Sequence, residues 1–167
     1  GVTFTEGTYT LTIGTHAHGT ITSGETPTKK IDCTSSESAA EDGCAANYTY
    51  PDDIVLTATP DDGYSFGSWT NCPSPSGATC TITDISANRT VSATFTAKQY
   101  TVTVTRPTAG GYVSMTGDTV EGVVDTIDCG PTGSGHNDCT AVATYNGPYT
   151  LSRTTSTGYT FSSWGGN

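Results

Sequence analysis

The chain contains an internal repeat, and this repeat sets its domain organisation. Residues 50–69 read Y-P-D-D-I-V-L-T-A-T-P-D-D-G-Y-S-F-G-S-W, and residues 145–164 repeat the pattern without a gap as Y-N-G-P-Y-T-L-S-R-T-T-S-T-G-Y-T-F-S-S-W. Upstream, the I-D-C that ends at Cys33 recurs as the I-D-C that ends at Cys129. A repeat of this length predicts two tandem modules of one kind.

The two copies differ at their C-terminal ends. The first copy continues past Trp69 through a second cysteine pair to the segment 89–96, R-T-V-S-A-T-F-T, whereas the second copy has no such segment after Trp164. We therefore expect the following parts: an N-terminal strand of a preceding or neighbouring repeat over residues 1–7, a first module over 8–97, and a second module over 98–167 that lacks its last strand.

The N-terminal residues match the segment that the second copy lacks. In the segment V-T-F-T at residues 2–5, Phe4 lies five residues before Tyr9. In the segment T-F-T at 94–96, Phe95 likewise lies five residues before Tyr100. An incomplete sheet leaves unpaired backbone groups and a bare apolar face, which makes the two ends complementary. The expected assembly strand consists of Val2, Thr3, Phe4 and Thr5.

Alternation of apolar residues and threonine predicts an all-β chain. Tyr9, Leu11 and Ile13 alternate with threonines, and residues 54–59 continue the same period of two, which is typical of half-buried strands. Hydrophobic residues are 33% and charged residues 13% of the chain, a composition that suits small β modules with threonine on the solvent faces. The short connection at 97–99 favours a rod-like pair of modules.

The charge and the hydropathy exclude two classes of partner. The formal net charge is −10 with only six Lys and Arg residues, and such a surface repels the phosphate backbone of nucleic acids. No apolar run approaches the length that spans a bilayer, so we expect no membrane span.

Six cysteines form three close pairs within loop-like sequence. Zinc sites usually need C-x-x-C pairs, and the sequence has none, so disulfides are the favoured interpretation. Because one pair repeats in the second copy, each bond is expected to close within its own module. Disulfides indicate an oxidising compartment, and we expect a secreted or extracellular protein. The expected pairs are Cys33–Cys44, Cys72–Cys80 and Cys129–Cys139.

These residues resemble a known family. The string L-T-A-T-P-D-D-G-Y-S-F-G-S-W, followed by C-x7-C and T-I-T-D-I-x5-V-S-A-T-F, resembles the divergent internalin B-type repeat, or B-repeat, of bacterial secreted and surface proteins. The resemblance covers residues 9–96 in full and 100–164 as a truncated copy, with a departure at 152–154, S-R-T. It implies a small, mostly β module, β-grasp-like or sandwich-like. It also implies a stalk, spacer or adhesive role at the bacterial cell surface, with no chemistry and no cofactor.

One set of aromatic residues recurs at identical spacing in both copies. Residues that every module carries usually build its core, and this is the favoured interpretation; a platform that stacks on sugars is the alternative. The expected core aromatics are Tyr64, Phe66 and Trp69 with Tyr159, Phe161 and Trp164.

Other candidate sites are weaker. His16 and His18 could share a face and hold a metal ion, and the acidic pairs at 52–53 and 61–62 could bind Ca²⁺. We favour exposed surface histidines and turn-forming aspartates instead. The sequence has no G-x-S-x-G, no phosphate loop and no H-E-x-x-H, so we expect no enzyme. Asn47 and Asn88 begin N-x-T triplets and are candidate glycosylation sites.

Two functions of different classes follow. The first is a structural extracellular protein, a filament or stalk subunit whose copies join head to tail by inter-chain strand complementation. The alternative is an adhesin or carbohydrate-binding fragment of a longer bacterial surface array. In that case surface glycans are the partners, and the two ends carry no meaning.

Overall fold

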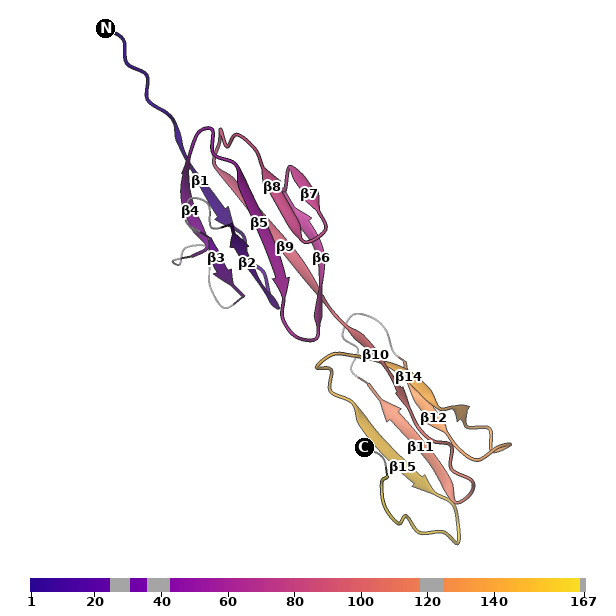
Figure 1. Cartoon of the computed structure of the whole chain (residues 1–167). Helices are drawn as coiled ribbons and strands as arrows, with labels where there is room; N and C mark the ends of the chain where they lie inside the picture. The colour runs from indigo at the N-terminus through magenta and orange to yellow at the C-terminus, as the bar shows by residue number, and fades with distance from the viewer. Residues whose placement is uncertain (25–30, 36–42, 118–124, 166–167) are drawn as a thin grey trace. The chain divides into compact units, whose positions relative to one another are not determined.

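The computed structural model describes residues 1–24, 31–35, 43–117 and 125–165 (Figure 1). Within these ranges the chain consists of β-strands and connecting loops without a helix, which confirms the all-β prediction. It divides into two compact units, Gly1–Ala97 and Lys98–Asn167. No helix in the described ranges has the length and apolar character needed to cross a bilayer.

The first unit contains a four-stranded sheet in which the last strand lies in the middle. The strand order is β4-β1-β9-β6, with β9 parallel to β1 and antiparallel to β6. Strand β9 is therefore held on both sides, by Leu11–Ile13 of β1 on one edge and by β6 on the other. The strands are β1 (Thr8–Ile13), β4 (Ala45–Thr49), β6 (Tyr64–Thr70) and β9 (Arg89–Ala97).

A second, five-stranded sheet faces the first. Its order is β3-β2-β5-β8-β7, and all neighbouring strands are antiparallel. The strands are β2 (Gly19–Ser23), β3 (Asp32–Thr34), β5 (Ile54–Pro60), β7 (Ser74–Ser76) and β8 (Thr79–Ile82).

The core of the first unit lies between these two sheets. Leu11 and Val91 of one sheet and Ile21 and Leu56 of the other are fully buried in a single cluster. Full burial of such a side chain stabilises the fold by about 1.5–3 kcal/mol. Strand alternation places the threonines on the opposite, solvent-facing sides, so the sequence pattern of period two corresponds directly to a sandwich.

The second unit has a two-stranded and a four-stranded sheet. Strand β10 pairs with β14, and the larger sheet has the order β13-β12-β11-β15. The strands are β10 (Gln99–Thr103), β11 (Gly111–Thr116), β12 (Ile127–Cys129), β13 (Asn137–Asp138), β14 (Thr140–Thr144) and β15 (Thr150–Thr155).

The strand registers of the two units correspond. Strand β1 pairs with β4 as β10 pairs with β14, and β2 pairs with β5 as β11 pairs with β15. The partner of Ser23 is Leu56 in the first unit, and the partner of Met115 is Leu151 in the second. Within residues 98–117 and 125–165, no strand corresponds to β6, β7, β8 or β9. The strands β10 and β15 each have one free edge there.

The second unit consequently has a smaller described core. Its buried cluster consists of Met115, Ile127, Cys129 and Ala141, with Tyr149 and three other residues packed against it. Residues Tyr64–Thr70 form strand β6 because β9 pairs with them. The corresponding residues of the second copy, 159–165, form no strand. The same local sequence therefore takes a different structure where the described residues provide no strand to pair with it.

Three disulfides connect the sheets. Cys33 in β3 bonds to Cys44 just before β4, and Cys72 after β6 bonds to Cys80 in β8. In the second unit, Cys129 in β12 bonds to the cysteine just before β14, Cys139. Each bond links one sheet of its unit to the other. By the loop-entropy estimate, each closure stabilises its unit by about 2–3 kcal/mol.

Candidate functional site

In the first unit, the ring of Phe95 closes one end of the core. The ring lies edge-on to Phe66, with a centroid distance of 6.4 Å, and 6.2 Å from the ring of His16. On its third side it covers Gly19, where an added Cβ would lie only 2.4 Å from Phe95 Cζ. The ring of Phe95 on strand β9 thus packs between Phe66, His16 and Gly19.

The other aromatic residues of the first unit are half-buried. Phe66 and Trp69 pack against the core cluster, with their ring centroids 5.7 Å apart. Tyr64 stacks on the imidazole of His18 at 4.0 Å and is also half-buried. Phe66 and Trp69 therefore extend the core, while Tyr64 covers a loop.

The equivalent residues of the second unit are placed differently. Phe161 and Trp164 keep their contact, with centroids 5.2 Å apart, but Trp164 is 52% exposed and Tyr159 is 55% exposed. The expectation that all six aromatics form core is therefore wrong for Tyr159 and Trp164. The physical reason is that no strand equivalent to β9 covers them within the described residues.

These exposed aromatics line a groove of about 680 Å³ in the second unit. It is lined by the end of β10, by β11, by β15 and by the segment 159–165. The apolar and glycine residues of its lining include Val104, Pro107, Gly111, Val113, Leu151, Phe161 and Trp164.

The groove corresponds to the space that Phe95 occupies in the first unit. Phe161 stands where the repeat places Phe66, and Gly111 stands at the strand position of Gly19. Pro107 comes from the loop that corresponds to the one carrying His16. Each of the three residues around the Phe95 ring, Phe66, Gly19 and His16, therefore has a counterpart in the groove lining. The groove can accept an aromatic side chain carried by an extended strand.

One charged side chain lies among the groove residues. Among the described residues of the lining, Arg153 is the only charged one, and its guanidinium carbon is 4.2 Å from the centroid of the Phe161 ring. In the first unit the same strand position is Ala58, which is buried. In the sequence, Arg153 is visible as the departure at residues 152–154, S-R-T, where the first copy has T-A-T. The sequence alone assigns no role to this departure.

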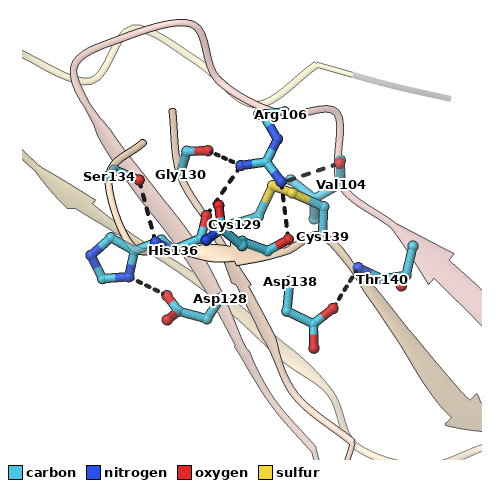
Figure 2. The surroundings of a disulfide bond; sticks show 11 residues. Val104, Arg106, Asp128, Cys129, Gly130, Ser134, His136, Asp138, Cys139 and Thr140 are labelled. Atoms are coloured by element: carbon cyan, nitrogen blue, oxygen red, sulfur yellow. Dashed lines mark hydrogen bonds and ion pairs between the residues drawn. A yellow bond between two sulfur atoms is a disulfide. The ribbon is translucent and has the colours of Figure 1, made fainter. Parts of the chain in front are cut away.

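A polar cluster fixes the loop behind the groove wall (Figure 2). Arg106 donates hydrogen bonds to the carbonyl oxygens of Gly130, His136 and Asn137, at 2.6, 3.2 and 3.0 Å. The imidazole Nδ1 of His136 lies 2.7 Å from Asp128 Oδ1, and the imidazole ring stacks on Tyr112 at 3.9 Å. Tyr112 lines the groove, so this cluster and the adjacent disulfide hold one wall in place. Sequence analysis did not find it, because its members are brought together only by tertiary structure.

The N-terminal segment is free of strand structure. Residues 1–7 belong to no strand, and the side chains of Val2 and Phe4 are 83% and 91% exposed. Thr3 and Thr5 are also exposed. An apolar, extended segment of this kind is available to another surface.

The weaker candidate sites are occupied by local contacts. The expectation of exposed histidines is wrong for His16, which is buried beside Phe95. His18 is stacked on Tyr64, so the two imidazoles do not face one site. Asp52 accepts a hydrogen bond from the backbone N–H of Thr49 at 2.9 Å, as expected for a turn. In the described ranges, no three potential metal ligands of the His, Cys, Asp or Glu type lie together.

Both candidate glycosylation residues accept hydrogen bonds from Thr10 of strand β1. Asn47 Oδ1 accepts a hydrogen bond from Thr10 Oγ1 at 2.8 Å, and Asn88 Oδ1 accepts one from the backbone N–H of Thr10 at 2.9 Å. Both asparagines are exposed, and their glycosylation stays a prediction.

Comparison with curated proteins and with solved structures found no match. Comparison with protein families found one: residues 30–99 match the model of the divergent InlB B-repeat domain. This range begins just before β3 and includes β9, the strand that completes the first unit. Over residues 30–99 the chain is therefore a divergent InlB B-repeat.

Proposed function

We propose that this protein is an extracellular subunit of a bacterial surface filament or stalk, whose copies join head to tail by strand complementation. Residues 2–5 of one copy add to the second unit of the next copy and fill its groove. The B-repeat family supports the coarser part, a repeat protein of the bacterial surface. The three disulfides are consistent with a location outside the cell.

The observation that carries the proposal is the match between an open groove and a free segment of the same chain. The groove has counterparts of the residues that surround Phe95, and the tripeptide Thr3-Phe4-Thr5 has the sequence of residues 94–96. The side chain of Phe4 is almost fully exposed in its own chain. Placing Phe4 in the groove removes two exposed apolar surfaces from water at once.

The contact between the donor segment of one copy and the groove of the next is called the joint. The first unit supplies the strand register expected for it. There, Phe95 pairs with Phe66 and Ala93 pairs with Trp69. The corresponding joint pairs Phe4 with Phe161 and Val2 with Trp164. Residues 161–165, which form no strand in the isolated chain, then become a strand with a partner.

The alternation of the donor strand is consistent with this register. In β9, Val91, Ala93 and Phe95 point into the core, and the threonine at 94 is exposed. Val2 and Phe4 then point inward, while Thr3 and Thr5 face solvent. A shift by one residue would bury the threonines and expose the phenylalanine, so the register is strongly specified.

A head-to-tail contact of this kind allows copies to be added one after another. The donor segment and the groove are different surfaces, so the interface is heterologous and does not close on itself as a two-fold dimer does. Each added copy presents a new groove or a new donor segment. The expected product is an open chain of copies, whose length depends on protein concentration.

The test is the oligomeric state of three proteins: wild type, Phe4→Asp and Thr5→Asp. Sedimentation velocity across a range of concentrations should show higher oligomers for the wild type and for Thr5→Asp, and monomers for Phe4→Asp. The two variants add the same charge one residue apart, so only the inward position should matter. Oligomers of normal length from Phe4→Asp would overturn the proposal, as would a wild type that stays monomeric at all concentrations.

The alternative function is carbohydrate binding in the same groove. The specific observation in its favour is the exposure of Tyr159 and Trp164, because exposed aromatic rings can stack on sugars. Isothermal titration of Phe4→Asp protein with soluble glycans, and with a peptide of residues 1–7, separates the two functions. Strand complementation predicts binding of the peptide, and the adhesin function predicts binding of a glycan that Trp164→Ala abolishes.

A further inference from the structure

We infer that Arg153 is the residue that selects the donor strand, through a salt bridge to Glu6 of the incoming copy. This inference rests on the proposed joint and concerns its specificity. Within the described part of the chain, the groove lining contains one charged side chain, Arg153, and the N-terminal segment 1–7 also contains one, Glu6. The two charges are opposite.

Neither charge is neutralised within its own surroundings. Among the residues that the structure describes, Arg153 contacts the Phe161 ring but has no acidic partner, and Glu6 has no basic partner. The side chain of Arg153 is exposed to solvent in the groove. An arginine that stacks on an aromatic ring keeps its donors free for a carboxylate at the ring edge.

The register of the joint places Glu6 two residues beyond the donor residue that meets the Phe161 ring. In the first unit Phe95 pairs with Phe66, and two residues further along β9, Ala97 pairs with Tyr64. Applied to the joint, Phe4 lies opposite Phe161 and Glu6 lies opposite Tyr159. Residues two apart on one face of a strand are about 7 Å apart, so Glu6 lies about 7 Å from Phe4 along the donor strand. Arg153 pairs with Val113, two residues from Gly111, so the contact depends on the length of its side chain, whose guanidinium carbon lies 4.2 Å from the centroid of the Phe161 ring.

The direction of the Glu6 side chain is consistent with this contact. In β9 the residues at 91, 93, 95 and 97 are all buried or half-buried, so the strand face that carries the phenylalanine also carries position 97. Glu6 is the donor residue at that position, and it therefore points toward the groove side. The guanidinium of Arg153 is already held over the Phe161 ring that Phe4 would join.

The first unit has uncharged residues at the two corresponding positions. The counterpart of Arg153 is Ala58, and the counterpart of Glu6 is Ala97. Where the strand belongs to the same chain, both positions are alanine, and no charge is needed to choose it. Where the strand is supplied by another copy, the chain has an acid on the donor and a base on the acceptor. Opposite charges across an interface favour the right partner and penalise like-charged ones.

The experiment uses the full chain with Phe4→Asp, which leaves the groove intact and removes its own donor. The ligand is the peptide of residues 1–7, acetylated and amidated so that Glu6 is its only charge. The affinities of the wild-type peptide, the Glu6→Gln peptide and the Glu6→Arg peptide are measured by titration calorimetry. A peptide with Phe4→Asp is the control for strand insertion.

We expect the Glu6→Gln peptide to bind about three- to fivefold more weakly than the wild-type peptide, and the Glu6→Arg peptide at least about tenfold more weakly. On protein that also carries Arg153→Glu, the order should reverse, and the Glu6→Arg peptide should bind best. In about 1 M salt the differences should shrink, because charges are screened within a few ångströms.

Two kinds of failure are distinguishable. If no peptide binds, or if the Phe4→Asp peptide binds as well as the wild-type peptide, the proposed joint itself is wrong. If binding depends on Phe4 but the three Glu6 peptides bind equally to both proteins, the joint stands and the role of Arg153 is overturned. Peptides that bind Arg153→Glu protein in the wild-type order would overturn it as well.

Discussion

Gly19 lies directly beneath the ring of Phe95, so closely that a Cβ on Gly19 would be 2.4 Å from Cζ of that ring. No real side chain tolerates such a distance, and one of the two residues would have to move. The contact shows why the strand that carries Phe95 fits only where its partner surface has a glycine. The second unit keeps a glycine at the same strand position, Gly111, beside an open groove.

The first prediction follows from this contact. Gly19→Ala should push the Phe95 ring out of its place and destabilise the first unit by about 1–3 kcal/mol, as overpacking of a filled core does. Gly24→Ala is the matched control, because a Cβ there meets no atom within 4 Å. Thermal unfolding should show a lowered midpoint for Gly19→Ala alone. Equal midpoints for the two variants would contradict the packing described here.

The second prediction separates the two tryptophans. Trp69 packs against the core, so Trp69→Ala should cost about 3–5 kcal/mol and unfold the first unit at moderate denaturant concentration. Trp164 is half exposed, so Trp164→Ala in the monomeric Phe4→Asp protein should change stability by less than about 1 kcal/mol. Denaturant titrations of both variants provide the measurement. A large loss of stability for Trp164→Ala in the monomer would mean that this side chain is core after all.

The third prediction concerns the disulfide of the second unit. Because Cys129–Cys139 joins its two sheets and the buried cluster there is small, Cys129→Ser with Cys139→Ser should destabilise this unit by about 2–3 kcal/mol. Hydrogen exchange measured by mass spectrometry should show faster exchange of strand β14 and unchanged exchange of strand β5. Unchanged protection of β14 would show that packing alone holds the sheets together.

The fourth prediction concerns alkaline pH. Burial raises the pKa of Tyr48 above its ordinary value of 10.0, the nearby charge of Asp52 raises it further, and a hydrogen bond with Ser23 partly lowers it. The folded state therefore holds this proton more tightly than the unfolded state. Stability from this group is complete below about pH 10 and falls as the pH rises from there toward the raised pKa.

Tyr48→Phe isolates this effect from the other tyrosines. Between about pH 9.5 and 11, the wild-type free energy of unfolding should fall more steeply than that of Tyr48→Phe, measured by urea titration at each pH. Parallel pH profiles of the two proteins would show that Tyr48 ionises as easily in the fold as in the unfolded chain.

Much of the local structure followed from the sequence. The period of two in residues 9–13 and 54–59 predicted strands with apolar inner faces, and these are β1 and β5, with Leu11 and Leu56 fully buried. Alternation determines local structure because each strand residue points to the opposite side from its neighbours. The B-repeat resemblance of the first copy is likewise confirmed by the family match over residues 30–99, whereas its extension to a second copy stays a prediction. These features depend on residues close together in the chain.

The features that depend on distant pairing did not follow from the sequence. The pattern G-Y-x-F-x-x-W occurs twice, yet it forms strand β6 around Phe66 and no strand around Phe161. The difference comes from β9, which pairs with β6 and covers its aromatic face, and the described second unit has no such strand. Sequence periodicity identifies the face a residue would present in a strand, but only a neighbouring strand decides whether that strand forms.

The same distinction applies to the groove. By itself, the sequence determined the repeat, the strand faces and the likeness between residues 3–5 and 94–96. Only the tertiary structure decided that Trp164 is exposed, that Arg153 lies over the Phe161 ring and that Gly19 supports Phe95. The physical reason is that burial and ring contacts depend on which strands pack across the core, and these strands come from parts of the chain far apart in sequence.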